Sequence, residues 1–167
     1  MKLTKLFILF SFALSIILIS AGANSFAQEK KISMKELPPA VLNSFHKTYP
    51  KAKIKGLSTE TEKGKTYFEI ESMDGTTRRD LLYTPDGKAA EIEETIPSSE
   101  LPKGSVQAIE KKIPGAKITH AERNIRGTKT TYELSVMSMK AKYEVVLDNA
   151  GKIVSDRKVT KEENDND

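Results

Sequence analysis

The reactive side chains of this chain are few, and their spacing matches no catalytic arrangement. The 167 residues include no cysteine, so no thiol can act as a nucleophile or as a metal ligand. A serine precedes a lysine by two positions at Ser33 and Lys35, and again at Ser138 and Lys140. A lysine activates a serine only where burial lowers the lysine pKa, and we expect the first pair in a flexible leader and the second in a hairpin turn. The sequence therefore predicts no catalytic residue and no enzymatic activity.

The candidate metal ligands are equally scattered. The only histidines are His46 and His120, which are expected on a helix and on a strand, whereas a metal site needs ligands that converge. Acidic pairs such as Glu93-Glu94 could offer carboxylate oxygens to calcium, but no loop carries the spaced acidic pattern of a dedicated calcium site. Solvated strand faces explain these carboxylates, so we expect neither a metal site nor a cofactor.

The first 27 residues indicate export. Two lysines precede an apolar run over residues 6–19, and small residues lead to Ala27, which is the pattern of a secretory signal peptide. We predict a signal peptide over residues 1–27, cleaved near Ala27, with cleavage after Ala23 as an alternative. An uncleaved membrane anchor is the other interpretation, but the apolar run is shorter than the about 20 residues that cross a bilayer. The chain is therefore predicted to be periplasmic or secreted, without membrane insertion after signal cleavage.

The charge balance argues against a nucleic-acid partner. The sequence has 27 lysines and arginines against 23 aspartates and glutamates, and removal of the signal peptide takes two lysines from that excess. The remaining charges of both signs are interspersed, whereas a nucleic-acid-binding protein concentrates its basic residues in a patch or stripe. Because no disulfide can form, the exported chain is expected to depend on core packing alone.

A repeat with an offset of 64 residues organises the rest of the chain. The matching segments are Glu36-Leu37-Pro38 with Glu100-Leu101-Pro102, Pro50-Lys51-Ala52-Lys53-Ile54 with Pro114-Gly115-Ala116-Lys117-Ile118, and Gly87-Lys88 with Gly151-Lys152. A fixed period indicates one supersecondary unit that is used twice. We assign residues 36–97 to the first unit and residues 98–160 to the second. A flexible leader is expected over residues 28–35 and a disordered tail over residues 161–167.

Each unit is predicted to contain one helix followed by four antiparallel strands. Apolar residues recur at helical spacing before Pro50 and before Pro114, and a proline ends a helix because its nitrogen has no hydrogen to donate. After each proline the apolar and polar residues alternate, which is the period of a strand. The expected strands cover residues 53–61, 65–72, 78–84 and 88–95, then 117–124, 130–137, 142–148 and 152–159. The fold class is therefore α+β, with both helices on one face of an antiparallel sheet that is either continuous, curved and eight-stranded or made of two abutting sheets.

The repeat also indicates which side chains share a face. Phe68 and Ile70 correspond to Tyr132 and Leu134, so inward positions match inward positions, and a slip of one residue would exchange the two faces. The opposite face is expected to be polar and open to solvent, and it is either a binding surface or an ordinary solvated face. The candidate binding residues on it are Lys65, Tyr67, Glu69 and Asp80 in the first unit and Lys129, Thr131, Glu133 and Glu144 in the second. The last strands of the two units do not share an apolar phase.

Three segments, each with a counterpart in the second unit, resemble the PepSY-like family that is related to beta-lactamase inhibitory protein. They are Tyr49-Pro50-Lys51-Ala52-Lys53-Ile54, Thr66-Tyr67-Phe68-Glu69-Ile70 and Tyr83-Thr84-Pro85-Asp86-Gly87-Lys88. The resemblance covers the chain from Leu37 to about Val159. It implies tandem helix-plus-four-strand units with two helices against one long, curved sheet. This sequence departs from the inhibitor because it has neither tryptophan nor cysteine, whereas the inhibitor uses aromatic anchors and disulfides.

What the resemblance implies about function is an exported, non-enzymatic binding module that contacts a protein or peptide through the exposed sheet face and can be inhibitory. The partner is expected to be an exported or envelope protein or peptide, and the module itself a monomer. The alternative is a small-molecule or ion-binding protein that acts in envelope stress or scavenging. The outward positions match less well between the units than the core does, so function is expected to lie where the units differ.

Overall fold

Glycines and prolines divide the chain into short elements, and the computed structural model describes them over residues 28–139 and 141–159. The helices are α1 (Pro39–Thr48) and α2 (Ser105–Lys112), and a 3-10 turn, η1, covers Ser98–Glu100. The strands of the first half are β1 (Gln28–Lys31), β2 (Lys53–Glu62), β3 (Lys65–Asp74), β4 (Thr77–Tyr83) and β5 (Ala89–Thr95). Those of the second half are β6 (Lys117–Arg126), β7 (Lys129–Ser138), β8 (Ala141–Asp148) and β9 (Ile153–Val159).

The two helices end in the same way. In α1 the N–H of Tyr49 donates to the carbonyl of Phe45 at 2.7 Å, and in α2 the N–H of Ile113 donates to the carbonyl of Ile109 at 2.7 Å. A proline follows each of these bonds and cannot extend the helix further. The prediction of one short helix before each of these prolines is confirmed.

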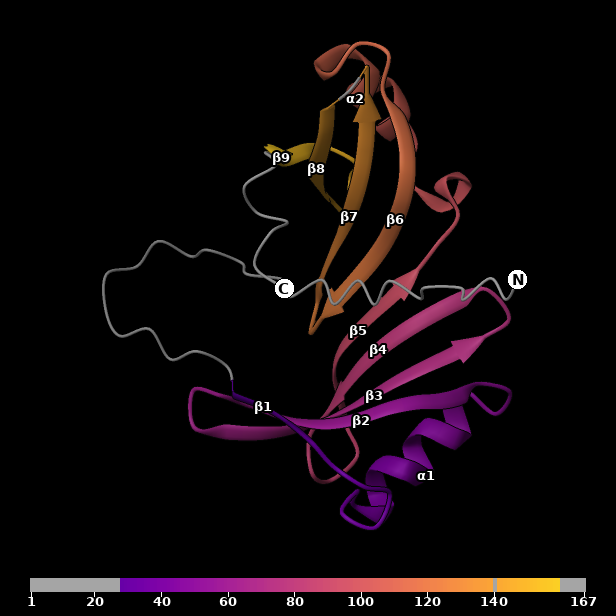
Figure 1. Ribbon diagram of the computed structural model, residues 1–167, viewed down its shortest axis with the longest axis vertical. Helices are drawn as coiled ribbons and strands as arrows, with labels where there is room; N and C mark the ends of the chain where they lie inside the picture. Colours follow the sequence, from indigo (N-terminus) through magenta and orange to yellow (C-terminus); the bar gives the residue numbers. More distant parts are fainter. Residues whose placement is uncertain (1–27, 140, 160–167) are drawn as a thin grey trace, which may run out of the picture.

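The strands form one antiparallel sheet in the order β1 to β9, so each strand pairs with its neighbours in sequence. Residues 91–95 of β5 pair with residues 122–126 of β6, and this pairing joins the two units into one continuous sheet. Figure 1 shows the sheet running between the two helices, with α1 beside the first half and α2 beside the second. The predicted α+β fold is confirmed, and the alternative of two abutting sheets is excluded.

The structure corrects the strand number and the flexible leader. Gln28–Lys31 pairs with residues 58–61 of β2, so the described sheet has nine strands instead of eight. The segment is wholly polar and shows no alternation that could have predicted a strand. It pairs because the edge of β2 would otherwise leave its backbone groups unpaired, and Ile32 continues the contact by donating its N–H to the carbonyl of Leu57 at 3.0 Å.

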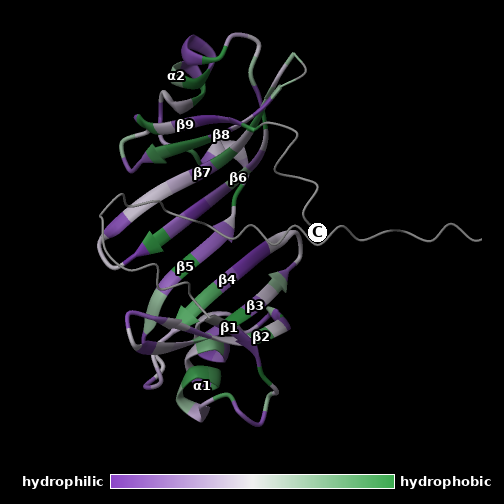
Figure 2. Ribbon diagram, turned by 60° about the vertical axis from the view of Figure 1, so that its left-hand side comes forward, coloured by the Kyte–Doolittle hydropathy of each residue, from purple (hydrophilic) through white to green (hydrophobic). Residues whose placement is uncertain are grey.

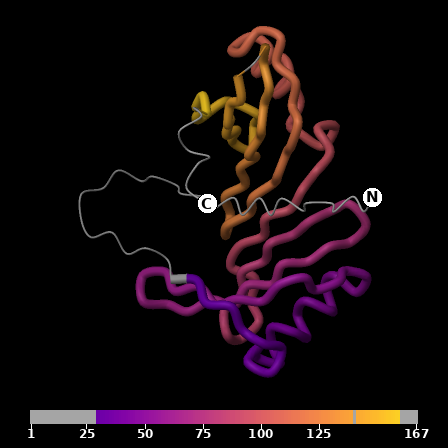
Figure 3. The backbone as a smooth tube through the Cα atoms, viewed as in Figure 1, coloured from indigo at the N-terminus to yellow at the C-terminus, as the bar shows by residue number. Residues whose placement is uncertain are grey.

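Each helix covers its own half of the sheet, and the two halves have separate cores. Val41 and Phe45 of α1 are buried against the first half, and Ile109 of α2 is buried against the second. The buried strand residues lie at equivalent positions of the repeat, with Ile70, Leu81 and Tyr83 in the first core and Leu134, Val145 and Leu147 in the second. Figure 3 follows the chain from the first half to the second through β5 and the segment after it.

Local irregularities also repeat. The β2–β3 register shifts between Ile54 and Gly56, and the β6–β7 register shifts at the equivalent positions, Ile118 and His120. Shifts between Leu82 and Tyr83 and between Val146 and Leu147 form a second equivalent pair. A bulge bends a strand and increases its twist, so the two units have the same curvature because they share the same bulges.

The last strands differ because their positions in the sheet differ. β5 lies inside the sheet between β4 and β6, and Ile96, directly after it, is buried in the second core. β9 is an edge strand on which residues 154–158 are exposed. An edge strand needs fewer apolar residues and is protected by charges, which explains why the two strands share no apolar phase.

In the described residues, no helix is long and apolar enough to cross a membrane. The predictions of a signal peptide over residues 1–27 and of a disordered tail over residues 161–167 lie outside the described residues.

Candidate functional site

One side of the sheet is covered by no helix of residues 28–139 and 141–159, and it is lined by the residues that alternate with the core positions. We call this side the open face. Its polar residues include Ser58, Glu60 and Glu62 on β2, Lys65, Tyr67, Glu69 and Glu71 on β3, Arg78 and Asp80 on β4, Glu91 and Glu93 on β5, His120, Glu122, Asn124 and Arg126 on β6, Lys129, Thr131 and Glu133 on β7, and Glu144 on β8. Figure 2 shows hydrophilic positions along β4, β5 and β6, where this face crosses from one unit to the other.

The sequence places all eight candidate binding residues on this side, and the structure agrees with that placement. Lys65 and Lys129 are exposed at the first positions of β3 and β7, and the other six residues are half-buried on β3, β4, β7 and β8. Strands β5 and β6 lie between the first-unit group and the second-unit group. The residues that connect the two groups are therefore ones that sequence reasoning missed.

The sheet bends toward the open face. A guanidinium nitrogen of Arg126 on β6 donates to the carboxylate of Glu62 on β2, although β3, β4 and β5 separate these strands in the sheet. Four strand spacings in a flat sheet would place the two backbones about 19 Å apart, which is too far for a direct contact between the two side chains. The open face is therefore hollowed along this side.

Carboxylates from three neighbouring strands gather at the centre of the open face. Glu122 lies directly opposite Glu133 in the β6–β7 register, and Glu93 lies opposite Asn124, two residues along β6 from Glu122. The Nε2 atom of His120 lies 2.9 Å from Oε1 of Glu122. The centre thus places three glutamates beside one histidine.

Burial and neighbouring carboxylates raise the pKa values of two of the three glutamates at this centre. Burial, and then the neighbouring Glu122, raise the pKa of Glu93 to about 9, while burial and Glu122 raise the pKa of Glu133 to about 7. Burial alone would also raise the pKa of Glu122, but hydrogen bonds with His120 and Glu93 lower it below its ordinary value. The hydrogen bond to Glu122 raises the pKa of His120. Glu93 and Glu122 therefore share one proton near neutral pH, as carboxyl groups in contact do.

Carboxylates away from this centre pair with arginine side chains. Arg78 Nη2 lies 3.1 Å from Oδ2 of Asp80, and Arg126 Nε lies 3.4 Å from Oε2 of Glu91. At the second-unit end, Arg157 Nη2 lies 2.6 Å from Oε2 of Glu144. Burial still raises the pKa of Asp80 above its ordinary value, although Arg78 opposes that rise.

The first-unit end of the open face combines a carboxylate, a hydroxyl and an aromatic ring. The hydroxyl of Ser58 donates to the carboxylate of Glu69, and burial raises the pKa of Glu69 in spite of that bond. Tyr67 lies directly opposite Glu60, whose pKa is raised by burial and by Glu62. Tyr67 is the one aromatic side chain that the predicted site residues contribute to the open face.

Glu93, Glu122 and His120 are the principal residues that sequence reasoning missed. The pair Glu93-Glu94 was interpreted as a solvated strand face, but its two members point to opposite sides of the sheet because side chains alternate along a strand. Glu94 lies on the helix side and accepts hydrogen bonds from Nε of Arg79 and of Arg123, each at 3.1 Å. The alternation of Glu91 and Glu93 indicates that they share one face of β5. Their neighbours on β6, however, depend on the strand pairing that joins the two units.

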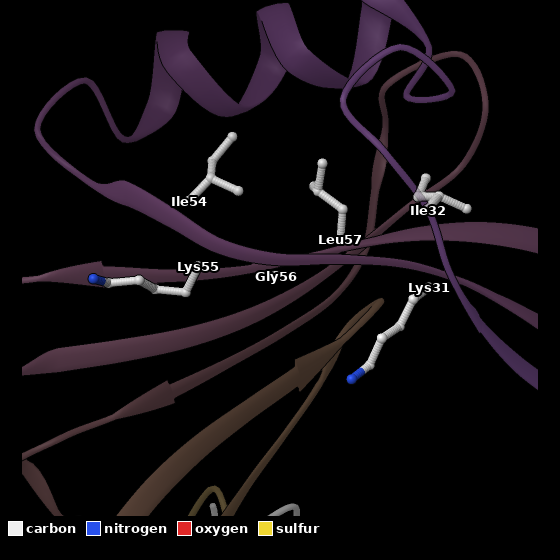
Figure 4. Close-up of a pocket in the computed structure, with 6 residues that line it drawn as sticks. All are labelled: Lys31, Ile32, Ile54, Lys55, Gly56 and Leu57. Atoms are coloured by element: carbon white, nitrogen blue, oxygen red, sulfur yellow. The ribbon is translucent and has the colours of Figure 1, made fainter. Parts of the chain in front are cut away.

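A separate hollow lies where β1 leaves β2. Figure 4 shows Ile54 and Leu57 directed toward α1, while Lys31 and Lys55 extend away on the other side of the strand. The residues that line it are Lys31, Ile32, Ile54, Lys55, Gly56 and Leu57. They include no carboxylate, imidazole or hydroxyl group, so this hollow offers no acid–base pair and no metal ligands.

Within residues 28–139 and 141–159, no group of three or more histidine, aspartate or glutamate side chains is arranged to hold a metal ion. The carboxylates of the open face are spread over several strands, whereas a metal site directs its ligand atoms at one point. Carboxylates spread in this way suit contact with an extended, charged surface better than coordination of a single ion.

A family model described as beta-lactamase-inhibitor-like and PepSY-like matches residues 25–90 of the sequence and also residues 66–155. No curated protein matches the chain.

Several solved structures share the fold. A DUF2874 family protein from Bacteroides uniformis ATCC 8492 superposes with a TM-score of 0.57 at 16% identity, over 74% of this chain and 91% of that chain. A protein from Bacteroides eggerthii DSM 20697 that is described as periplasmic gives 0.57 at 16% identity, over 74% and 89%. A BLIP-like protein from Bacteroides fragilis NCTC 9343 gives 0.54 at 14% identity, over 73% and 86%. At these identities the likeness shows the fold alone.

Proposed function

The chain belongs to the beta-lactamase-inhibitor-like, PepSY-like family, and from this premise we propose that it is an exported, non-enzymatic binding module whose open face contacts a protein or peptide. The observation that carries the proposal is the open face itself. It continues across both units through the β5–β6 pairing, and neither helix of the described part of the chain covers it. Inhibition of an enzyme is one consequence that such binding would have, as the description of the family suggests.

The half-buried side chains of the open face support this function. Six of the eight candidate residues are neither fully exposed nor fully buried, so a partner can reach them without displacing the core. A stable protein interface depends on a few anchors, among which tyrosine and arginine are common. Tyr67, Arg78 and Arg126 provide such side chains on this face, although tryptophan is absent.

We place the protein in the periplasm. The charged and apolar pattern of residues 1–27 is that of a secretory signal, and one structural neighbour is described as periplasmic. Cleavage near Ala27 would leave a chain without cysteine. Such a chain can form no disulfide in an oxidising compartment. The partner is then an exported or envelope polypeptide.

The test begins with the full chain, expressed with its own N-terminal segment and isolated from the envelope fraction after crosslinking. Each captured polypeptide is identified, purified and titrated against the chain by calorimetry. A variant with Tyr67→Ala and Glu133→Lys changes both halves of the open face, and Val106→Ala changes an exposed residue of α2 as the control. We expect the double variant to bind at least about tenfold more weakly and the control to bind normally. Equal affinity of the double variant and the unaltered chain for every partner would exclude the open face.

A further inference from the structure

Two buried polar atoms on the helix side of the first unit have no hydrogen-bond partner among the described residues. They are Oγ of Ser72 on β3 and Nη1 of Arg79 on β4. Ser72 lies directly opposite Arg79 in the β3–β4 register, so the two side chains are neighbours on one side of the sheet. Ser72 is only 1% exposed, and a buried polar group without a partner destabilises the folded chain. A small group that accepts a hydrogen bond from both atoms would remove this cost.

The second unit shows that the fold does not require these two polar side chains. The repeat offset of 64 residues places Val136 where the first unit has Ser72, and Tyr143 where it has Arg79. Val136 and Tyr143 are paired in the β7–β8 register in the same way, and Val136 is fully buried in the second core. The polar pair is therefore a feature of the first unit alone.

Positive charge exceeds buried negative charge beside the two atoms. Nε of Arg79 and Nε of Arg123 each donate to the carboxylate of Glu94 at 3.1 Å, so one carboxylate serves two guanidinium groups. The side chains of Arg79 and Glu94 are each 14% exposed. Glu100 also lies near Arg123, but it is half exposed and 3.7 Å away. An anion beside Arg79 would therefore meet a positive potential where water screens it little.

We propose that Ser72 and Arg79 bind a chloride ion, through the hydroxyl of Ser72 and an Nη1–H group of Arg79. A guanidinium group has no acceptor atom and a hydroxyl can donate, so a ligand that accepts both hydrogen bonds satisfies both atoms. A monatomic anion does this and also balances the second guanidinium charge, whereas water leaves that charge as it is. The carboxylate or phosphate of a larger molecule does not fit, because both atoms are buried.

The chloride ion would connect α1 to the sheet. Tyr49 ends α1 by donating its N–H to the carbonyl of Phe45, and its ring lies over the guanidinium group of Arg79, 4.8 Å from the central carbon to the ring centroid. An ion that holds Arg79 in place also holds the surface on which Tyr49 packs. Because the ion binds only the folded chain, stability should rise with the chloride concentration. The proposal is independent of the proposed function, since the site lies on the opposite side of the sheet from the open face.

The experiment compares thermal melts of the full chain in sodium chloride and in sodium gluconate at the same ionic strength. Gluconate is too large for the site, so it controls for the screening of surface charges. The test variant is Ser72→Ala, which removes one donor without adding volume. The control is Ser105→Ala, which removes another buried hydroxyl without a partner among the described residues, but from α2 in the second unit.

We expect about 100 mM chloride to raise the midpoint of the unaltered chain and of Ser105→Ala by about 3 °C or more over gluconate. The midpoint of Ser72→Ala should rise by less than about 1 °C, because one of the two donors is lost. A midpoint of the unaltered chain that does not depend on the anion would overturn the proposal. An equal rise in Ser72→Ala would also overturn it, since chloride would then act elsewhere.

A crystal structure of the unaltered full chain in sodium bromide locates the ion without any variant. Bromide replaces chloride and scatters anomalously, so a peak between Oγ of Ser72 and Nη1 of Arg79 would support the proposal. Density there without an anomalous signal would identify a water molecule and overturn it, as would a direct hydrogen bond between the two side chains. Either failure leaves the proposed function standing, because the binding experiment on the open face does not involve these residues.

Discussion

Glu62 and Arg126 occupy equivalent positions in the two units, and their side chains form an ion pair with each other. They are 64 residues apart, which is the offset of the repeat, and each is the last residue of its strand. Divergence at one repeated position has thus created a contact between the copies. The contact lies on the open face, where it holds the β2–β3 hairpin over β6.

This pair predicts a charge-swap rescue. Arg126→Glu places two carboxylates together and also removes the partner of Glu91, so the free energy of unfolding should fall by about 1 kcal/mol. The double variant with Glu62→Arg should recover part of that loss in urea unfolding. A double variant less stable than Arg126→Glu alone would show that the pair does not connect the units.

The Arg79–Glu94–Arg123 contacts predict a larger effect on the helix side of the sheet. Glu94 is 14% exposed and pairs with both arginines, and its loss would leave two guanidinium groups without that partner. Glu94→Ala should lower the free energy of unfolding by about 3 kcal/mol. Glu100→Ala is the control, because Glu100 is half exposed and lies 3.7 Å from Arg123, and it should cost less than about 1 kcal/mol. Similar losses in the two variants would contradict this assignment.

Stability should decrease as the pH rises from about 5 to about 9. Glutamates have a pKa near 4.3 in the unfolded chain, whereas Glu93 has a pKa of about 9 and Glu133 of about 7 in the folded chain. The folded chain therefore binds more protons over this range, so the free energy of unfolding falls as these protons are lost. The raised pKa of His120 acts in the same direction.

Urea unfolding at about pH 5, pH 7 and pH 9 measures this dependence, and we expect a fall of more than about 1 kcal/mol. Glu93→Gln with Glu133→Gln should flatten the profile, because an amide does not titrate. Asp74→Asn, at an exposed strand end, should leave it unchanged. A stability that rises with pH, or a pH dependence that the double variant does not flatten, would contradict the raised pKa values of Glu93 and Glu133.

Two equivalent glycines should be intolerant of substitution. Gly87 has φ +84°, and a Cβ atom there would lie 2.5 Å from the carbonyl oxygen of Ala40 at the start of α1. Gly151 has φ +80° and would bring its Cβ within 2.6 Å of Oγ of Ser105 in α2. Gly87→Ala should therefore cost about 3 kcal/mol or more, from left-handed strain plus the backbone clash.

Gly127→Ala is the matched control, because Gly127 has φ +62° and nothing lies within 4 Å of the added carbon. It should cost only the strain, about 1 kcal/mol. Thermal melts measure the loss of stability in Gly87→Ala and in Gly127→Ala. Equal losses would show that the close contact between the Gly87 turn and α1 does not affect stability.

Local periodicity was enough to predict most of the elements. Prolines and glycines lie at nearly every boundary, and the match of Ile70 with Leu134 gave the inward phase of both units without any structure. The prediction failed at Gln28–Lys31, where the strand forms only because β2 offers an unpaired edge. It also gave no reason for the different last strands, because an interior strand and an edge strand follow from the order of the whole sheet.

The candidate site was predicted only in part, for the same physical reason. The alternation of polar and apolar residues determined that Tyr67, Glu69 and Glu133 lie on the side away from the helices, because it depends on near neighbours in the chain. Which carboxylates of the two units lie side by side depends on the β5–β6 pairing. The whole of α2 separates these two strands in the chain, so their pairing cannot be deduced from near neighbours in the sequence. The sequence by itself therefore determined two copies of one unit and the residues of its outer side. Only the tertiary structure decided that the outer sides of the two units form one bent face with Glu93, Glu122 and Glu133 at its centre.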